Sequence, residues 1–91
     1  MHVRFRVSFR GRVQGVGFRV TVQALAAQRA LSGWVRNEPD GSVTLEAQGA
    51  ADEVEGLLED VRGVMPTNIE REDRAEIPPV EGEPSGVRIT G

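Results

Sequence analysis

The chain has 91 residues, enough for one compact domain with a modest core, and its formal net charge is -3. It contains no cysteine, which excludes disulfides, thiolate metal sites and a cysteine nucleophile, so we expect a cytoplasmic protein. No apolar stretch approaches the roughly 20 residues that a membrane-spanning helix needs. The first residues also lack the apolar segment of a signal peptide.

Charge is distributed unevenly along the chain. Residues 1–37 contain seven arginines and no acid, whereas residues 38–91 contain all fourteen acids and four arginines. The first half could therefore offer a positive potential to a small anion while the acidic remainder discourages binding of nucleic acid. Alternatively, folding mixes the two halves and cancels the asymmetry, and the sequence leaves both interpretations open.

The first half of the chain predicts a strand, a helix and a hairpin. Apolar and polar residues alternate over 3–10, which is typical of a strand with one buried face. Apolar residues recur at helical spacing over 18–26, and we expect this helix to end at Gly33. Segments 34–37 and 42–48 flank a turn sequence with Pro and Asp-Gly, which indicates a β-hairpin.

The second half predicts one more helix and two more strands. An apolar stripe at i, i+3, i+4 and i+7 marks a helix over 51–62, closed by Gly63. A strand over 67–73 follows, then a loop rich in Pro and Gly, and a short strand over 87–90.

These elements predict a single domain of the α+β class. Each helix has one apolar face, and so do the strands. Such elements pack most simply as two layers, with both helices on one side of an antiparallel sheet. The order β-α-β-β-α-β, plus a short C-terminal strand, is that of the ferredoxin-like sandwich. Right-handed crossovers would place the first and third strands side by side at its centre.

The segment 11–19, GRVQGVGFR, joins the first strand to the first helix and is the candidate anion site. Unpaired main-chain N–H groups and the helix dipole favour phosphate at such a position. Gly15 and Gly17 can adopt positive φ angles, so that successive amides form a concave nest. Arg19, in the first helical turn, can bind two phosphate oxygens through its planar guanidinium.

Two other glycine motifs fail to match this loop. A Walker A loop needs a lysine, and the chain has none. A dinucleotide fingerprint needs a third glycine where Val20 stands. From spacing alone, an ordinary tight turn with a surface arginine fits as well as a phosphate site.

A resemblance decides between them. The segments GRVQGVGFR (11–19), GWVRN (33–37) and DGSV (40–43) resemble, in order and spacing, the signature of the acylphosphatase family. This resemblance covers residues 3 to about 66. It implies the ferredoxin-like fold and hydrolysis of acyl phosphates to a carboxylate and inorganic phosphate, by a small monomeric enzyme with no cofactor and no metal.

The resemblance also assigns roles by position. The catalytic residues fall on Arg19 and Asn37, and the phosphate-binding residues on Gln14, Gly15, Val16, Gly17, Phe18 and Arg19. A carboxylate leaving group departs without a general acid, so binding the phosphoryl group and orienting a water suffice. The carboxamide of Asn37 can orient that water, and the substrate phosphate takes the proton.

Other residues are assigned no site. The aromatic run of RNA-recognition sheets is missing, so Phe5 and Phe9 are expected in the core, and the acids of segment 51–62 are expected in solvent. Arg12 and Arg36 either extend a positive surface or pair with acids. The final RITG lacks the aromatic residue with which the family often ends, which leaves open whether terminal residues contact Arg19. The alternative functions are carbamoyl-phosphate handling, as in a large hydrogenase-maturation protein, and non-catalytic anion binding.

Overall fold

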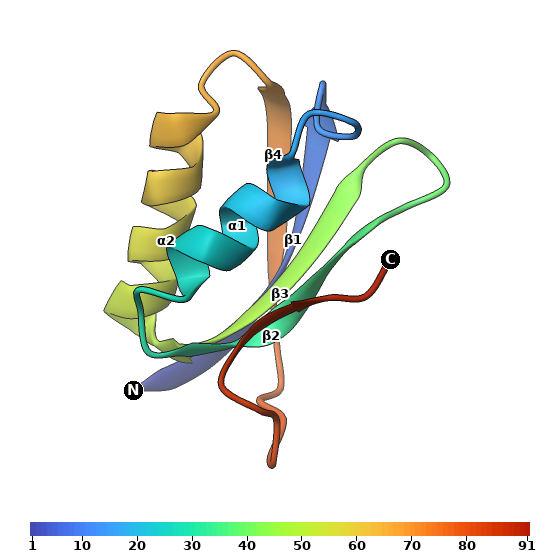
Figure 1. Cartoon of the computed structure of the whole chain (residues 1–91). Coiled ribbons are helices and arrows are strands. Elements are labelled where there is room, and N and C mark those ends of the chain that lie inside the picture. The colour runs from blue at the N-terminus through green and yellow to red at the C-terminus, as the bar shows by residue number, and fades with distance from the viewer.

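The computed structural model describes all 91 residues, and it shows a five-stranded sheet with both helices on one side (Figure 1). The elements follow the chain as β1 (His2–Gly11), α1 (Phe18–Ala26), β2 (Leu31–Asn37), β3 (Val43–Ala50), α2 (Ala51–Val64), β4 (Ile69–Ile77) and β5 (Gly86–Ile89). The predicted order and the two-layer ferredoxin-like fold are therefore confirmed. No helix is both long enough and apolar enough to cross a membrane.

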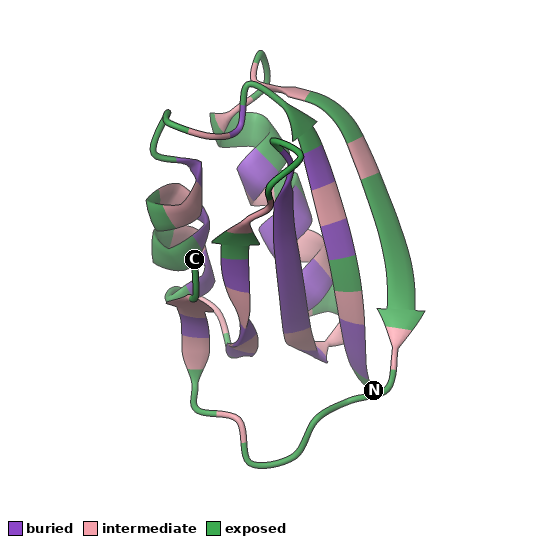
Figure 2. Cartoon of the chain, turned by 90° about the vertical axis from the view of Figure 1, so that its right-hand side faces the viewer, coloured by how far each residue is buried: buried purple, intermediate pink, exposed green.

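The strand order is β4-β1-β3-β2-β5, with β1 beside β3 at the centre as predicted. The four longer strands pair antiparallel, but β5 pairs parallel to β2, so the sheet is mixed rather than antiparallel throughout. The loop 78–85 explains the difference, because it leads from β4 at one edge to β5 at the other (Figure 2). Since β4 ends where β2 begins, a strand that follows this loop must run in the direction of β2.

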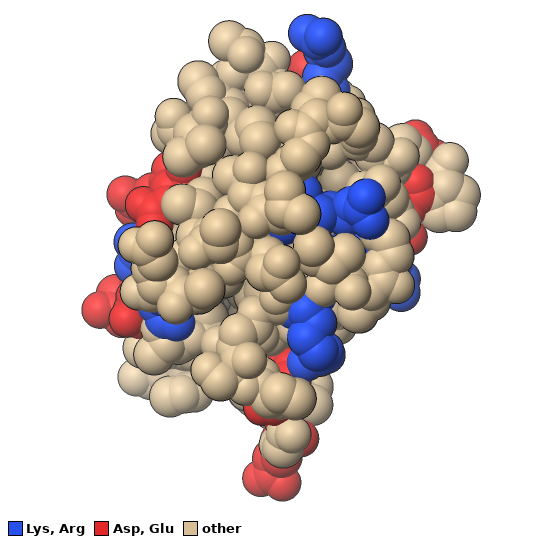
Figure 3. All heavy atoms as spheres, viewed as in Figure 1, with Lys and Arg blue, Asp and Glu red and all other residues tan.

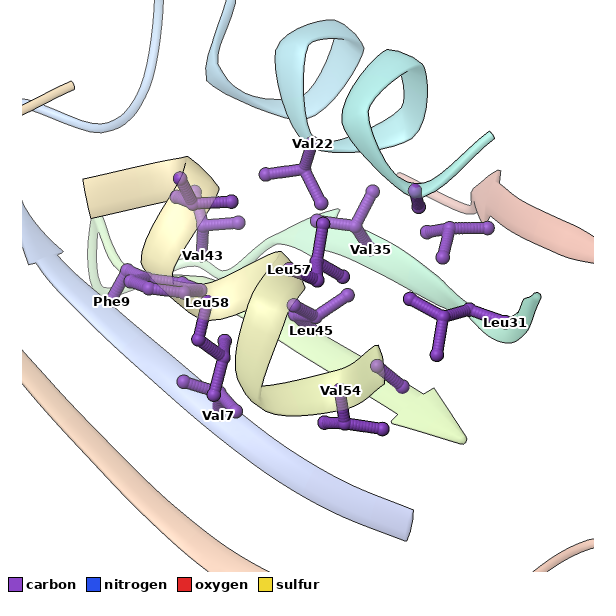
Figure 4. Close-up of a cluster of buried hydrophobic side chains, with 14 of the residues drawn as sticks. Val7, Phe9, Val22, Leu31, Val35, Val43, Leu45, Val54, Leu57 and Leu58 are labelled. Carbon is purple, nitrogen blue, oxygen red and sulfur yellow. The ribbon is translucent and has the colours of Figure 1, made fainter. Parts of the chain in front are cut away.

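The core fills the space between the sheet and the helices. It contains Phe9 from β1, Leu45 from β3, and Leu57 and Leu58 from α2, all fully buried (Figure 4). The ring of Phe18, at the start of α1, meets that of Phe9 edge to face at 5.1 Å between centroids. This contact holds the beginning of α1 against the middle of the sheet.

Two expected helix ends, at Gly33 and at Gly63, are wrong. Helix α1 ends at Ala26, and Gly33 lies inside β2 with φ 151°, where a Cβ would stand only 1.8 Å from the Glu46 carbonyl oxygen. Gly33 therefore allows two strands to approach closely instead of stopping a helix. Gly63 lies inside α2, which continues for one more residue.

The sheet face opposite the helices carries a buried ion-pair network. The Arg4 guanidinium, whose side chain is 2% exposed, donates to Glu46 Oε1 at 2.8 Å and to Glu83 Oε1 at 2.8 Å. Glu83 belongs to the loop 78–85, so this network fastens the loop to the sheet. The alternating pattern correctly placed Arg4 on the polar face, but that face is covered here.

Candidate active site

The loop between β1 and α1 has the backbone shape expected of an anion-binding nest. Gly15 has φ 74° and Gly17 has φ 77°, both in the left-handed region, and Gly17 is the residue that caps α1. No non-glycine residue of the chain has a positive φ angle. The two glycines thus turn successive peptide groups toward one side of the loop.

The main-chain N–H groups from Gln14 onward in this loop have no partner in the protein. None of those from Gln14 to Val20 donates a hydrogen bond to a protein oxygen, and no side chain caps α1. At a helix N-terminus such donors carry a partial positive charge, which makes the position favourable for an anion. The main-chain donors of the predicted phosphate-binding residues are thus left without a protein acceptor.

Arg19 lies in the first turn of α1, directly beyond this donor surface. Its Nη1 atom donates to the Gly91 oxygen at 2.5 Å, and no carboxylate side chain lies within ion-pair distance of it. The structure therefore answers the question that the sequence left open, since the last residue does contact Arg19. The missing aromatic residue had no bearing on this contact, because the contact is made by the main chain.

Asn37 is the last residue of β2, where it pairs with Val43. Its main-chain N–H donates to the same Gly91 oxygen, at 2.8 Å. Its side-chain Oδ1 is buried and accepts no hydrogen bond from the protein. Arg19 and Asn37, predicted as a pair from separate motifs, are thus brought together around one atom.

A side-chain bridge joins the loop to the hairpin that carries Asn37. Gln14 Nε2 donates to the carbonyl oxygens of Glu38, at 2.8 Å, and Ser42, at 2.9 Å. These residues flank the turn between β2 and β3, so the loop and the hairpin stand at the same end of the sheet (Figure 1). The sequence assigned Gln14 to phosphate binding through its main chain, and nothing in the sequence indicated this second contact.

Both carboxylates of the hairpin turn are held ionised. The Ser42 hydroxyl and main-chain N–H, together with Arg10, lower the pKa of Asp40 to about 2. The Thr44 hydroxyl, followed by Arg36, lowers the pKa of Glu38. Neither group can serve as a proton donor near neutral pH, so the turn next to Asn37 supplies no general acid.

Ion pairs cancel most of the charge asymmetry seen in the sequence. Five of the seven arginines in residues 1–37 pair with acids from later in the chain, namely Arg4, Arg6, Arg10, Arg29 and Arg36. The two that pair with no Asp or Glu side chain are Arg12, the first residue of the loop, and Arg19, just after it. Figure 3 shows arginine atoms in the middle of the face that carries α1, with acidic side chains around its margins. The arginines of residues 1–37 that keep no Asp or Glu partner thus lie at the candidate site.

A hollow of about 150 Å³ opens beside the loop. It is lined by Val13, Gly15, Gly17, Phe18, Arg19, Val20 and Ile89. A larger and shallower hollow of about 460 Å³ lies between α2 and β4, but its arginines, Arg62 and Arg71, are engaged by Glu72 and Asp73. The smaller hollow is the one that combines an arginine free of acids with unpaired main-chain donors. The structure contains no cluster of three or more side chains suited to hold a metal ion.

Comparison with known proteins agrees with this geometry. The family model described as acylphosphatase matches residues 5–86. A curated acylphosphatase from Rhizobium etli is 40% identical over 93 residues, which cover 98% of this chain and 93% of the relative. One from Oceanobacillus iheyensis is 52% identical over 56 residues, and there the chain spans only 62% of the relative's length.

A solved structure agrees along the whole chain. The crystal structure of acylphosphatase from Bacillus subtilis superposes with a TM-score of 0.87 at 34% sequence identity, and the match covers 98% of this chain and 99% of that one. Sequence, fold and the arrangement of the loop therefore lead to the same conclusion. The chain belongs to the acylphosphatase family.

Proposed function

We propose that this chain hydrolyses acyl phosphates, with the phosphate held by Arg19 and the main-chain amides of residues 14–19. The observation that supports it best is the run of unpaired N–H donors around two left-handed glycines, beside an arginine that pairs with no Asp or Glu side chain. Such donors stabilise the charge that develops on phosphoryl oxygens during transfer. The names of the relatives support the same reaction class.

The chemistry of an acyl phosphate fits a site without a general acid. The leaving group is a carboxylate with a pKa near 4 to 5, so it departs unprotonated at neutral pH. Catalysis then needs only a fixed phosphoryl group, stabilised oxygens and a water in line with the breaking bond. The ionised Glu38 and Asp40 agree with this requirement, because neither could donate a proton.

In this proposal, Asn37 orients the attacking water. Its carboxamide makes no hydrogen bond within the protein and the residue is only partly buried, so one end of the amide can accept a hydrogen bond from a water molecule and the other end can donate one. The substrate's own phosphate oxygen takes the proton that the water releases. The other guanidinium nitrogens of Arg19, which have no partner in the protein, would bind substrate oxygens while Nη1 stays on the Gly91 oxygen.

Hydrolysis of benzoyl phosphate in a chelating buffer tests the proposal. Arg19→Ala should lower kcat/KM by about 100- to 1000-fold and weaken inhibition by inorganic phosphate, because both depend on the guanidinium. Asn37→Ala should lower kcat by about 100-fold and change the phosphate inhibition constant by less than about 3-fold, because Asn37 binds the water and not the phosphate.

Matched controls replace residues of the same type elsewhere. Arg71→Ala removes an exposed arginine paired with Asp73, and Asn68→Ala removes an asparagine outside the proposed machinery. Both should keep near-native turnover. A native chain that binds phosphate but does not hydrolyse benzoyl phosphate would favour the non-catalytic module instead, and native turnover in Arg19→Ala would refute the assignment of that residue.

A further inference from the structure

One side chain connects the two halves of the proposed site. Both hydrogen-bond partners of Gln14 are main-chain carbonyl oxygens, those of Glu38 and Ser42. Because carbonyl oxygens only accept, the amino end of the carboxamide must face them. The side chain therefore acts as a double donor from the loop to the hairpin.

The hairpin turn does not need Gln14 to satisfy its own polar groups. The Glu38 oxygen already accepts from the Gly41 N–H at 3.1 Å, and the Ser42 oxygen accepts from the Glu38 N–H at 2.8 Å. The bonds from Gln14 add to these, and no other side chain of residues 12–17 bonds to the hairpin. Their structural result is a fixed separation between loop and hairpin.

That separation sets the geometry of the proposed reaction. In the proposed reaction the loop amides donate to the phosphate oxygens, and Asn37, which immediately precedes Glu38, holds the water. A displacement of about 1 Å between reacting groups can cost about 100-fold in rate. We propose that Gln14 is a positioning residue. Through its two bonds to the hairpin it keeps the Asn37 side chain at a fixed distance from the main-chain amides that bind the phosphate. This inference rests on the proposed function.

The first test replaces Gln14 with methionine, which keeps the length of the side chain and removes both donors. We expect Gln14→Met to lower kcat for benzoyl phosphate by about 10- to 100-fold while the inhibition constant of inorganic phosphate changes less than about 3-fold. Asn68→Ala is the matched control. It removes an amide-to-carbonyl bond on the other side of the loop, from Asn68 Nδ2 to the Arg12 oxygen at 3.0 Å, and should leave kcat near native.

A double-mutant cycle separates positioning of Asn37 by Gln14 from a general loss of structure in the loop. If Gln14 acts through Asn37, then Gln14→Met should cost less than about 3-fold in kcat when Asn37 is already alanine. The full loss in that background, or a phosphate inhibition constant that rises in parallel with the fall in kcat, would overturn the proposal. Circular dichroism melting of each variant checks that it is folded at the assay temperature.

A second variant keeps the test decisive if Gln14→Met does not fold. Gln14→Asn retains the donors on a side chain one methylene shorter, and the same loss of kcat at constant phosphate inhibition is expected of it. Activity of the native chain separates failure of the proposed function from failure of the role proposed for Gln14. If it shows no hydrolysis, the proposed function fails, whereas native hydrolysis with an additive cycle overturns only the role of Gln14.

Discussion

The Arg19 guanidinium and the Asn37 main-chain N–H donate to the same Gly91 oxygen, at 2.5 and 2.8 Å. A further bond, from the Thr90 N–H to the Val35 oxygen at 3.0 Å, fixes the end of the chain against β2. The last residue thus restrains the guanidinium on the side where the phosphate is proposed to bind.

Deletion of Gly91 should therefore raise KM. Arg19 would lose its only hydrogen-bond partner and regain side-chain freedom, and ordering a free arginine costs about 1.5–2 kcal/mol. We expect KM for benzoyl phosphate and the phosphate inhibition constant to rise together by about 10- to 30-fold. A lower KM would instead mean that Gly91 mainly competes with substrate for Arg19.

Substitutions at Gly15 should report backbone strain without steric clash. A Cβ at this position would have no atom within 4 Å, but φ is 74°. Gly15→Ala should therefore cost about 1–2 kcal/mol in unfolding free energy. Gly15→Asn should cost less, because asparagine tolerates this conformation. Urea unfolding measures both, and equal losses for the two variants would contradict the argument.

The control for Gly15 is Gly63, which lies in α2 and also has open space around its Cβ position. No positive φ occurs there, and alanine has a higher helix propensity than glycine. Gly63→Ala should raise the free energy of unfolding by about 0.5–1 kcal/mol.

Substitution at Gly33 should be far more damaging than at either of these positions. In Gly33→Ala the new Cβ would lie 1.8 Å from the Glu46 carbonyl oxygen, inside the antiparallel pair of β2 and β3. Relief requires β2 and β3 to separate, so we expect a loss of more than about 3 kcal/mol or failure to fold. Near-native stability in urea unfolding would show that these strands have more freedom than their register suggests.

Local patterns predicted what depends on local physics. The alternation of apolar and polar residues predicted β1, and the Asp-Gly turn predicted the hairpin. The apolar residues spaced from Val54 to Val61 predicted α2. Spacing marked the loop glycines, but Arg19 and Asn37 were assigned through the resemblance to a family signature, and both donate to the Gly91 oxygen in the structure. These signals each lie within about ten residues of sequence.

Features that depend on distant segments could not be predicted in this way. The role of Gly33 depends on an oxygen of β3, and the direction of β5 depends on the end at which β4 terminates. The burial of Arg4 depends on Glu83, which lies in a loop that composition marked only as irregular. The bond from Gln14 to the hairpin is likewise visible only once the chain is folded.

The contact between Arg4 and Glu83 should make stability depend on pH. Hydrogen bonding to Arg4 lowers the pKa of Glu83 below its ordinary value of 4.5. Because the pKa is lower in the folded state than in the unfolded state, the stabilisation is fully present above the unfolded pKa. It is lost as the pH falls through the folded pKa, since protonation then ends the charge pairing.

Glu83→Gln should therefore cost about 1–3 kcal/mol at pH 7, and the difference from the native chain should shrink as the pH falls below 4.5. Glu38, Asp40 and Glu55 also have lowered pKa values, so both proteins should lose stability in acid, but the variant should do so less steeply. Urea unfolding at several pH values measures this. Glu81→Gln, in the same loop and without a hydrogen-bond partner, should follow the native curve, and a constant difference between native and Glu83→Gln would show that the contact does not titrate.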